Sequence, residues 1–415
     1  MEGYMGNKIK KHIILILAML MIFNVMACGK NNNKADISGD GTTLDDTQPY
    51  FNTVFHVIAK GEKGYYFISK AETDKKYTSD NFLFYMDGTT KECIKLCGKA
   101  ECNHKNEECN AYLGKDYLKN IYFYNNKLYL IKYENGKAVL EETLPDGTDR
   151  KKIGEIGTST GKEQVAQKLA FSGDNVYILD GNENESSEND IQTVRVYKMS
   201  LLDGKKEVAY EYKGFLATIK SLRSYGGNIY FKLDCMVEKN TDNNSSGNGR
   251  RQFKMSGDGV VKIDGKTGET SKVLEGVISD YAIDIDSNNI YYYEYSKGLY
   301  CMDAGTGKSE LIYKADDSTA SCVMSYDGNN IYLDNTDWVS WGHVYGGTPK
   351  YDKKCFVLDK QGNKTGDVDI SDLNLIYYGD SEYLFGEKYG EREASMVYIE
   401  KSKLPDTEWK YVVEE

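Results

Sequence analysis

A short motif recurs along most of the chain: a turn of Gly, Asn or Asp is followed by an aliphatic residue and a tyrosine. The clear copies end at Tyr129, Tyr177, Tyr230, Tyr291 and Tyr332, and looser copies end at Tyr65 and Tyr383. Successive copies lie roughly 40 to 60 residues apart, and no helical pattern of apolar residues separates them. One supersecondary unit repeated at this spacing predicts an all-β fold, a seven-bladed β-propeller.

The composition agrees with many short strands joined by turns. The 415 residues include 35 tyrosines, 40 glycines and only 4 prolines. Tyrosine suits a pleated, half-buried surface, and glycine suits tight turns. Because a closed ring of repeats can be this long as one unit, we expect residues 50–415 to form a single β-propeller domain.

One repeat shows the internal plan of a blade. Four stretches of strand-like sequence follow one another: Val277–Asp284, Ile290–Tyr295, Leu299–Asp303 and Ser309–Tyr313. The turns between them are rich in Asp, Asn, Ser and Gly, several of which tolerate the positive φ that tight hairpins need. The plan predicts four-stranded antiparallel blades, whose strands we label A to D from the axis outward.

The connections between strands differ in length in a regular way. The A–B and C–D connections are short nearly everywhere, whereas B–C carries insertions in four blades: Lys70–Asn81, Gly181–Ile191, Glu238–Gly257 and Asn335–Lys354. In such a blade the B–C and D–A connections emerge on the same face of the disc. This face is therefore predicted to bind a ligand, although solvated loops can also lengthen without any function.

The N-terminus predicts the location of the protein. Basic residues precede an apolar run from Ile13 to Phe23, which is the order of a secretory signal and is short for a membrane span. The following Val25-Met26-Ala27-Cys28 resembles the lipobox of bacterial lipoproteins, which implies cleavage after Ala27 and a diacylglycerol thioether on Cys28. An uncleaved anchor with an incidental cysteine is the alternative. The lipidated cysteine and the uncleaved anchor both predict that the protein is attached to the outer face of the cytoplasmic membrane.

The remaining N-terminal residues and the charge complete this picture. We expect residues 1–27 to be the signal peptide, and residues 28–49, which are mostly polar, to form a disordered tether behind the lipidated cysteine. The net charge of −12 argues against nucleic acid and against electrostatic docking on anionic lipid. The acyl chains must then provide the membrane anchor. We expect the protein to be a monomer.

One segment concentrates residues that bind metals. Four side chains, which we call the Cys3His set, fall within a short stretch after the first repeat: Cys97, Cys102, His104 and Cys109. Three thiolates and one imidazole can close a tetrahedral zinc site, so a structural zinc ion is one interpretation. The spacing lacks the tight pairs that usually mark such sites. By the plan above, the segment follows strand D of the first blade, with Cys93 in that strand, and enters the D–A connection.

Disulfide bonds and free thiols are the alternatives for this segment. An exported protein meets oxidising conditions, and a cysteine-rich loop without a core benefits from a covalent link, in which case His104 has no role. Cys93 and Cys97 cannot pair with each other, because strand spacing separates them by roughly 13 Å. The other four cysteines lie in apolar strands and are expected to pack as small hydrophobic residues: Cys235, Cys301, Cys322 and Cys355.

A second candidate site lies in the long B–C insertion of the sixth blade. It contains four side chains that could stack on a sugar ring or a peptide side chain: Trp338, Trp341, His343 and Tyr345. The same rings could instead pin a long loop to the disc. For catalysis the sequence offers little, because the three histidines after the signal lie in different blades and no nucleophile-elbow or zinc-protease motif occurs.

The combination of features resembles a known group of proteins. The Asn-Ile-Tyr turns, the third strands ending in Asp-Gly, the lipobox and the cysteine segment are similar to uncharacterised β-propeller lipoproteins of low-GC Gram-positive bacteria, relatives of TolB-like and YWTD-type propellers. The YWTD tetrapeptide itself is absent, and the resemblance implies no activity. The sequence thus predicts a lipid-anchored, non-enzymatic module that binds a peptide, glycan or partner protein.

Two other functions stay open at this level. A carbohydrate-active or other hydrolytic propeller would need carboxylates in the central channel, because glycosidases use such pairs and propeller sites draw residues from many strands. An accessory subunit of a membrane complex would need only the sides of the propeller.

Overall fold

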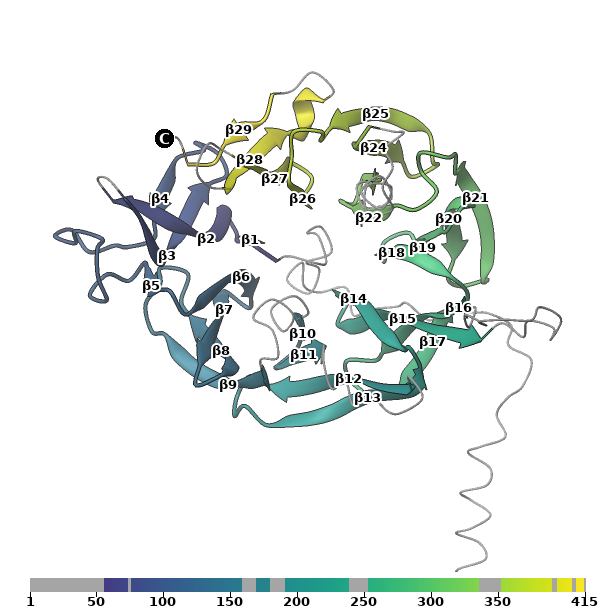
Figure 1. The fold of residues 1–415 in the computed structure, drawn as a ribbon, viewed down its shortest axis with the longest axis horizontal. Coiled ribbons are helices and arrows are strands. Elements are labelled where there is room, and N and C mark those ends of the chain that lie inside the picture. Colours follow the sequence, from purple (N-terminus) through teal and green to yellow (C-terminus); the bar gives the residue numbers. More distant parts are fainter. Residues whose placement is uncertain are drawn as a thin grey trace, which may run out of the picture.

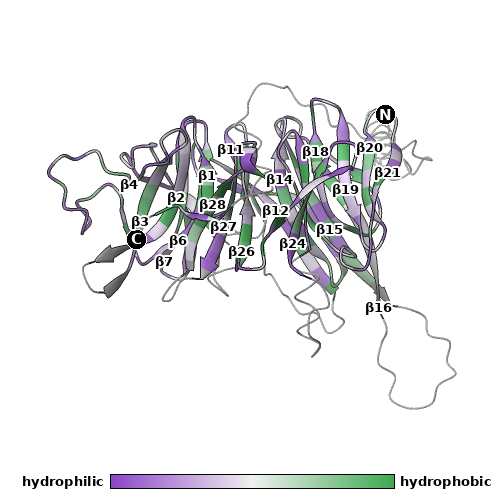
Figure 2. Cartoon of the chain, turned by 90° about the horizontal axis from the view of Figure 1, so that it is seen from above, coloured by the Kyte–Doolittle hydropathy of each residue, from purple (hydrophilic) through white to green (hydrophobic). Residues whose placement is uncertain are grey.

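The computed structural model describes residues 56–73, 76–158, 169–179, 191–238, 253–335, 352–389, 394–404 and 408–413. These residues form seven antiparallel sheets arranged around a central axis (Figure 1). Seen from the side, the strands of each sheet run between the two faces of a disc (Figure 2). The predicted seven-bladed β-propeller is confirmed.

Each blade consists of strands that are consecutive in the chain. Blade 1 contains β1 (Ile58–Lys60), β2 (Gly64–Thr73), β3 (Lys76–Asp87), β4 (Cys93–Lys95) and β5 (Tyr112–Gly114). Blade 2 contains β6 (Tyr117–Tyr124), β7 (Lys127–Glu134), β8 (Lys137–Thr143) and β9 (Lys151–Thr158). Blade 3 contains β10 (Leu169–Ser172), β11 (Asn175–Leu179), β12 (Ile191–Ser200) and β13 (Lys206–Phe215).

The second half of the ring repeats the plan. Blade 4 contains β14 (Thr218–Tyr225), β15 (Asn228–Glu238), β16 (Phe253–Ile263) and β17 (Thr270–Leu274). Blade 5 contains β18 (Ile278–Asp284), β19 (Asn289–Glu294), β20 (Gly298–Asp303) and β21 (Lys308–Lys314). Blade 6 contains β22 (Val323–Tyr326), β23 (Asn330–Asp334), β24 (Lys354–Asp359) and β25 (Lys364–Asp369). Blade 7 contains β26 (Leu375–Tyr378), β27 (Tyr383–Tyr389), β28 (Ala394–Glu400) and β29 (Lys410–Tyr411), with the 3₁₀ helix η3 (Lys401–Lys403) after β28.

The short turns adopt the conformations that their sequence predicts. Asn125 and Asn126, between β6 and β7, have φ values of 48° and 55°, and Asn135 and Gly136, between β7 and β8, have 52° and 77°. Asparagine and glycine tolerate this left-handed region better than other residues, and it matches the twist of the hairpin. No helix in the ranges given above is long and apolar enough to cross a membrane.

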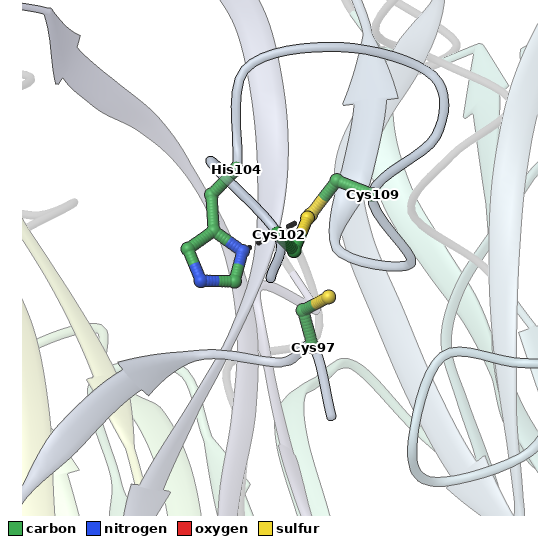
Figure 3. A group of neighbouring side chains, drawn as sticks. All are labelled: Cys97, Cys102, His104 and Cys109. Atoms are coloured by element: carbon green, nitrogen blue, oxygen red, sulfur yellow. Dashed lines mark hydrogen bonds between the residues drawn. The ribbon is translucent and has the colours of Figure 1, made fainter. Parts of the chain in front are cut away.

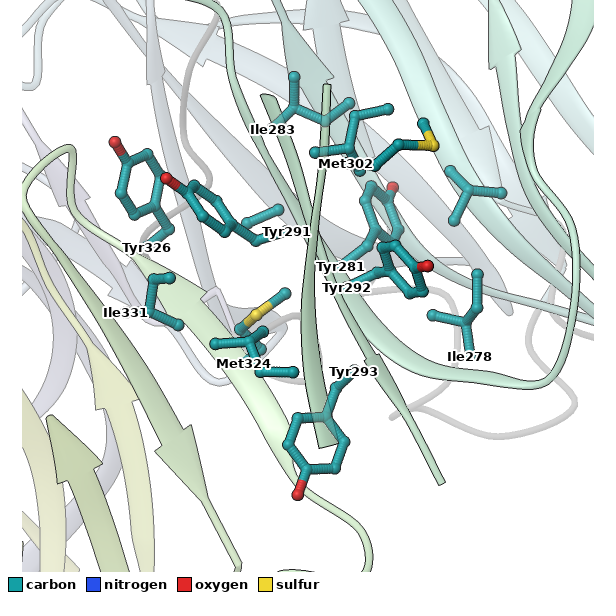
Figure 4. Packing of buried hydrophobic residues seen from close by; sticks show 14 of the residues in the cluster. Ile278, Tyr281, Ile283, Tyr291, Tyr292, Tyr293, Met302, Met324, Tyr326 and Ile331 are labelled. Atoms are coloured by element: carbon teal, nitrogen blue, oxygen red, sulfur yellow. The ribbon is translucent and has the colours of Figure 1, made fainter. Parts of the chain in front are cut away.

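The hydrophobic core lies between the blades rather than inside a single sheet. Inner strands such as β19 are buried over four consecutive residues, whereas the outer strand β21 is mostly exposed. The largest cluster joins blades 4, 5 and 6; in Figure 4, Tyr291 of blade 5 lies beside Tyr326 of blade 6, with ring centroids 5.4 Å apart. The repeated tyrosine therefore fills the space between neighbouring blades.

Buried tyrosines also place their hydroxyl groups on polar partners. Tyr281 donates a hydrogen bond to the Ser221 carbonyl at 2.7 Å, and Tyr326 donates one to the Asp284 carboxylate at 2.8 Å. Two tyrosines of the repeated motif do the same: Tyr65 donates to Asp380 at 2.5 Å and Tyr332 donates to Asp327 at 2.8 Å, bonds that a phenylalanine could not make.

Three successive blade interfaces share an ionic contact that the sequence analysis did not predict. A buried aspartate at the end of strand A or in the A–B turn of one blade pairs with a lysine of the next blade. The pairs are Asp284–Lys360 at 3.0 Å, Asp327–Lys401 at 2.7 Å and Asp380–Lys60. The recurring aspartate was visible in the sequence, but tight turns also favour aspartate, so the residue type alone did not reveal a partner in another blade.

Blades 7 and 1 close the ring through side chains. In the part of the chain that the structure describes, no sheet combines strands from both ends of the chain. Tyr65 of β2 donates a hydrogen bond to Asp380 at 2.5 Å, and the Tyr65 and Phe385 rings lie 5.0 Å apart. A single apolar cluster spans both blades. Packing and hydrogen bonds thus hold this interface together.

The innermost strands of blades 4, 5 and 6 share a buried ion pair. Arg223 of β14 and Asp280 of β18 are 3.0 Å apart, and their side chains are 4% and 3% exposed. The Met324 backbone in β22 donates to Asp280 at 2.9 Å and accepts from Arg223 at 3.3 Å. One ion pair therefore connects three consecutive blades.

Candidate metal centre

The outer strand of blade 1 is divided into two pieces. β4 pairs with Phe84–Met86 of β3, and β5 pairs with Asn81 and Phe82 of the same strand. Leu83 joins the two pieces: it accepts from Leu96 N–H at 2.9 Å, and its own N–H donates to the Ala111 carbonyl at 2.8 Å. The chain leaves strand D after Leu96 and returns to the same strand at Ala111.

This arrangement corrects the predicted position of the cysteine segment. Residues 97–110, which we call the cysteine excursion, interrupt the outer strand instead of following it into the D–A connection. The segment therefore lies at the outer edge of blade 1 and not among the B–C connections. The sequence could not show this, because it depends on the pairing of β5 with β3.

Blade 2 contacts the base of the excursion. The Arg150 guanidinium donates to the Asn110 carbonyl at 3.0 Å and to the Tyr112 carbonyl at 3.2 Å. Within the excursion, Cys102 N–H donates to the Lys99 carbonyl at 3.1 Å, and Cys109 N–H donates to the Asn106 carbonyl at 3.0 Å. Tight turns thus bring the widely spaced ligand residues together.

The four side chains of the Cys3His set converge, as Figure 3 shows. One ligand atom of each side chain, a sulfur or an imidazole nitrogen, lies within 4.8 Å of all the others. His104 Nδ1 and Cys109 Sγ lie 3.3 Å apart. Cys109 is buried and the other three are half-buried. The set predicted from sequence therefore forms a single cluster, which is able to hold a metal ion.

The sulfurs differ in their electrostatic surroundings. Burial disfavours the Cys97 thiolate, but the N–H groups of Lys99 and Asn110 donate to it and bring the pKa below its usual range. Burial raises the pKa of Cys109 to about 11, against the opposing effect of the Ala111 N–H. Cys93, which lies outside the set, has its pKa raised to about 12 by burial alone. Hydrogen-bond donors are therefore directed at sulfurs of the cluster.

All eight cysteines of the described residues have free thiols. Cys322 and Cys355 are almost fully buried, Cys235 is 7% exposed, and Cys301 is half-buried. These four pack as the small hydrophobic residues that the sequence predicted. Three thiols and an imidazole in one cluster leave the metal interpretation open and give His104 a place in it.

The other predicted sites lie outside the described residues. They are the lipidation site Cys28 with its signal and tether, and the aromatic group Trp338, Trp341, His343 and Tyr345. The lipidation site and the aromatic group therefore remain predictions from the sequence.

Buried carboxylates near the axis have cationic partners. Asp280 pairs with Arg223, and Asp284, at the end of the same strand, pairs with Lys360. Farther from the axis, in strand C of blade 2, Glu142 pairs with Lys127 at 2.8 Å and with Lys151 at 2.7 Å. Apart from the Cys3His set, the described residues contain no group of three His, Cys, Asp or Glu side chains close enough to share a metal ion.

Comparison with known proteins informs the fold. No protein-family model and no curated protein matches the chain. A prolyl endopeptidase structure has a TM-score of 0.54 and 11% identity, over 88% of this chain and 50% of that chain. The β-propeller domain of the Trilobed protease from Pyrococcus furiosus has a TM-score of 0.47 and 11% identity, over 88% of this chain and 98% of that chain. TolB from Acinetobacter baumannii has a TM-score of 0.36 and 13% identity, over 72% of this chain and 61% of that chain.

The likeness to the prolyl endopeptidase structure supports the overall fold and nothing more specific. The chain spans about half the length of the prolyl endopeptidase. At this level of identity, the activity of a similar structure does not carry over, because one fold supports many functions.

Proposed function

We propose that the protein is a non-catalytic binding module, held by a lipid on Cys28 at the outer face of the cytoplasmic membrane. Its ligand is a peptide, a glycan or a partner protein, which binds the rim formed by the B–C connections. The propeller provides a rigid ring, and the inserted segments provide the contacts.

The use of buried charges supports this proposal most directly. In the described residues, Asp280, Asp284, Asp327 and Asp380 each pair with a lysine or arginine of a neighbouring blade. A glycosidase needs one carboxyl group to donate a proton and a second to act as nucleophile or base. Carboxylates that are engaged between blades serve the ring, which favours a scaffold over an enzyme with its site on these strands.

The strand bounds support the choice of rim. Between strands B and C, the chain passes through residues 180–190 in blade 3, 239–252 in blade 4 and 335–353 in blade 6. The insertion predicted for blade 1, Lys70–Asn81, was wrong: β2 extends to Thr73 and β3 begins at Lys76, so its residues lengthen the two strands instead of forming a loop. The A–B connections are much shorter, for example residues 285–288 in blade 5 and 327–329 in blade 6. Long connections on one side of a regular scaffold commonly carry binding residues.

A binding experiment tests the ligand proposal. The full chain, extracted from membranes in mild detergent, is applied to peptide and glycan arrays beside a variant carrying Trp338→Ala and Trp341→Ala. Aromatic hot-spot residues contribute about 2 kcal/mol or more to the free energy of binding, so we expect the affinity to fall by at least about 30-fold. Trp409→Phe, which changes a tryptophan of blade 7, is the matched control and should bind like the wild type. Turnover of an array probe by the wild type would overturn the non-catalytic proposal.

A separate experiment tests the anchor. Cys28→Ser should abolish lipid labelling and remove the protein from the membrane fraction, whereas Cys301→Ser should leave both unchanged. Continued lipid labelling of the Cys28→Ser protein would contradict the assignment.

A further inference from the structure

We propose that the Cys3His set binds one zinc ion in a closed, tetrahedral, structural site. The ligands are the sulfurs of the three cysteines and Nδ1 of His104. This inference concerns the outer edge of blade 1 and does not depend on the identity of any ligand at the rim.

The distances between ligand atoms fit this ion. Zinc bonds of about 2.3 Å to sulfur and about 2.0 Å to nitrogen place tetrahedral ligands about 3.8 Å apart for two sulfurs and about 3.5 Å apart for sulfur and nitrogen. The four atoms here lie within 4.8 Å of one another, and His104 Nδ1 is 3.3 Å from Cys109 Sγ. Shifts of an ångström or less complete the tetrahedron.

The ligand types select zinc over other common metals. Calcium and magnesium require oxygen ligands, whereas three thiolates and one imidazole suit zinc. All four tetrahedral positions are taken by protein side chains, so no position remains for a water or a substrate. The site therefore supports the fold and does not catalyse a reaction.

The backbone around the set provides the second layer of a metal site. N–H groups of Lys99 and Asn110 donate to the Cys97 sulfur, and the N–H of Ala111 donates to the Cys109 sulfur. Hydrogen bonds of this kind orient metal ligands and stabilise their negative charge. Binding replaces the protons of the three thiols, so three thiols and one Zn²⁺ give a zinc tris-thiolate and three released protons.

The position of the set explains why an ion is needed. The excursion leaves strand D after Leu96 and re-enters it at Ala111, both hydrogen-bonded to Leu83 of β3. Cys109 is the most deeply buried residue of the Cys3His set. A disulfide would join two of the sulfurs, leave the third beside it and leave His104 without a role. One ion fixes all four side chains and closes the two halves of the divided strand.

Metal analysis of the intact protein tests the proposal. The full chain is extracted from membranes in detergent without added zinc or chelator, and its metal content is measured by mass spectrometry. We expect about one zinc ion per chain. Cys102→Ser and His104→Asn should each reduce the zinc content at least tenfold. Asn replaces His104 because the backbone there has a φ of 53°, which Asn tolerates. Cys93→Ser, a neighbouring cysteine outside the set, should keep one zinc ion.

A second measurement keeps the proposal testable if the variants do not fold. Replacing zinc by Co²⁺ in the wild-type protein should give the intense visible bands of tetrahedral cobalt together with thiolate charge-transfer absorption. Weak bands typical of octahedral cobalt would contradict the site. A zinc-free protein, with the three cysteines either reduced or disulfide-bonded, would also overturn it, as would equal zinc in the wild type and both ligand variants.

Discussion

The buried pair Arg223–Asp280 offers a quantitative test of the view that charges near the axis serve the ring. Changing Arg223 to Met keeps much of the side-chain volume but leaves the Asp280 carboxylate without its cation. Removing one partner of a buried pair costs about 3–5 kcal/mol. In this variant Asp280 still accepts hydrogen bonds from the N–H groups of Met324 and Tyr281, both at 2.9 Å. We therefore expect a loss of unfolding free energy at the low end of that range, about 3 kcal/mol.

The pair should show strong coupling in a double-mutant cycle. Asp280→Asn leaves a buried guanidinium and should also cost about 3 kcal/mol, but the double variant has no uncompensated charge. We expect it to cost about 3 kcal/mol in total, which corresponds to a coupling energy of about 3 kcal/mol. The free energy of unfolding is measured by urea titration of the detergent-solubilised chain, followed by circular dichroism.

An exposed pair on an outer strand provides the control. Arg195 and Glu211 of blade 3 are 2.6 Å apart, with side chains 24% and 52% exposed. Arg195→Met should cost about 1 kcal/mol or less, because solvent screens the charges. A cost below about 1 kcal/mol for Arg223→Met, or additive effects of the two changes, would refute the reasoning.

Two further predictions concern other blade interfaces. Tyr65→Phe removes a buried hydrogen bond to Asp380 and should lower the free energy of unfolding by about 1.5–3 kcal/mol. Backbone hydrogen exchange should become faster in β1, β2, β26 and β27. Unchanged exchange in these strands would contradict closure of the ring by these side chains. Burial alone would raise the pKa of Asp284, but bonds from Ser287, Tyr326 and Lys360 lower it overall. A carboxyl group whose pKa is lowered on folding stabilises the fold at pH values above its unfolded-state pKa of about 3.9. This stability is lost as the pH falls through the folded-state pKa. The difference in the free energy of unfolding between the wild type and Asp284→Asn should therefore narrow below about pH 4. Parallel curves would contradict this prediction.

The sequence predicted local structure well because strand and turn signals are local. The stretches Val277–Asp284 and Leu299–Asp303 correspond to β18 (Ile278–Asp284) and β20 (Gly298–Asp303) within one residue at each end. The turn residues and tyrosines that mark these elements lie within them or directly beside them, so the local pattern indicates where each strand begins and ends.

Contacts between distant residues were not predictable in the same way. Tyr65 and Asp380 are 315 positions apart, and neither residue type indicates the other. The Cys3His set was identified because its members are close in the chain, but its position was not, because β5 returns to β3 only through pairing in the folded blade. The aromatic group of the sixth blade remains a prediction from sequence.

Sheets built only from consecutive strands affect how such a protein can change during evolution. A gene segment that encodes one blade carries a whole sheet, so its duplication or loss leaves no sheet with a missing strand. New chain ends placed between two blades would likewise leave every sheet intact. The cost of such rearrangements falls on the side-chain contacts between blades, where the buried tyrosines and ion pairs would have to find matching neighbours.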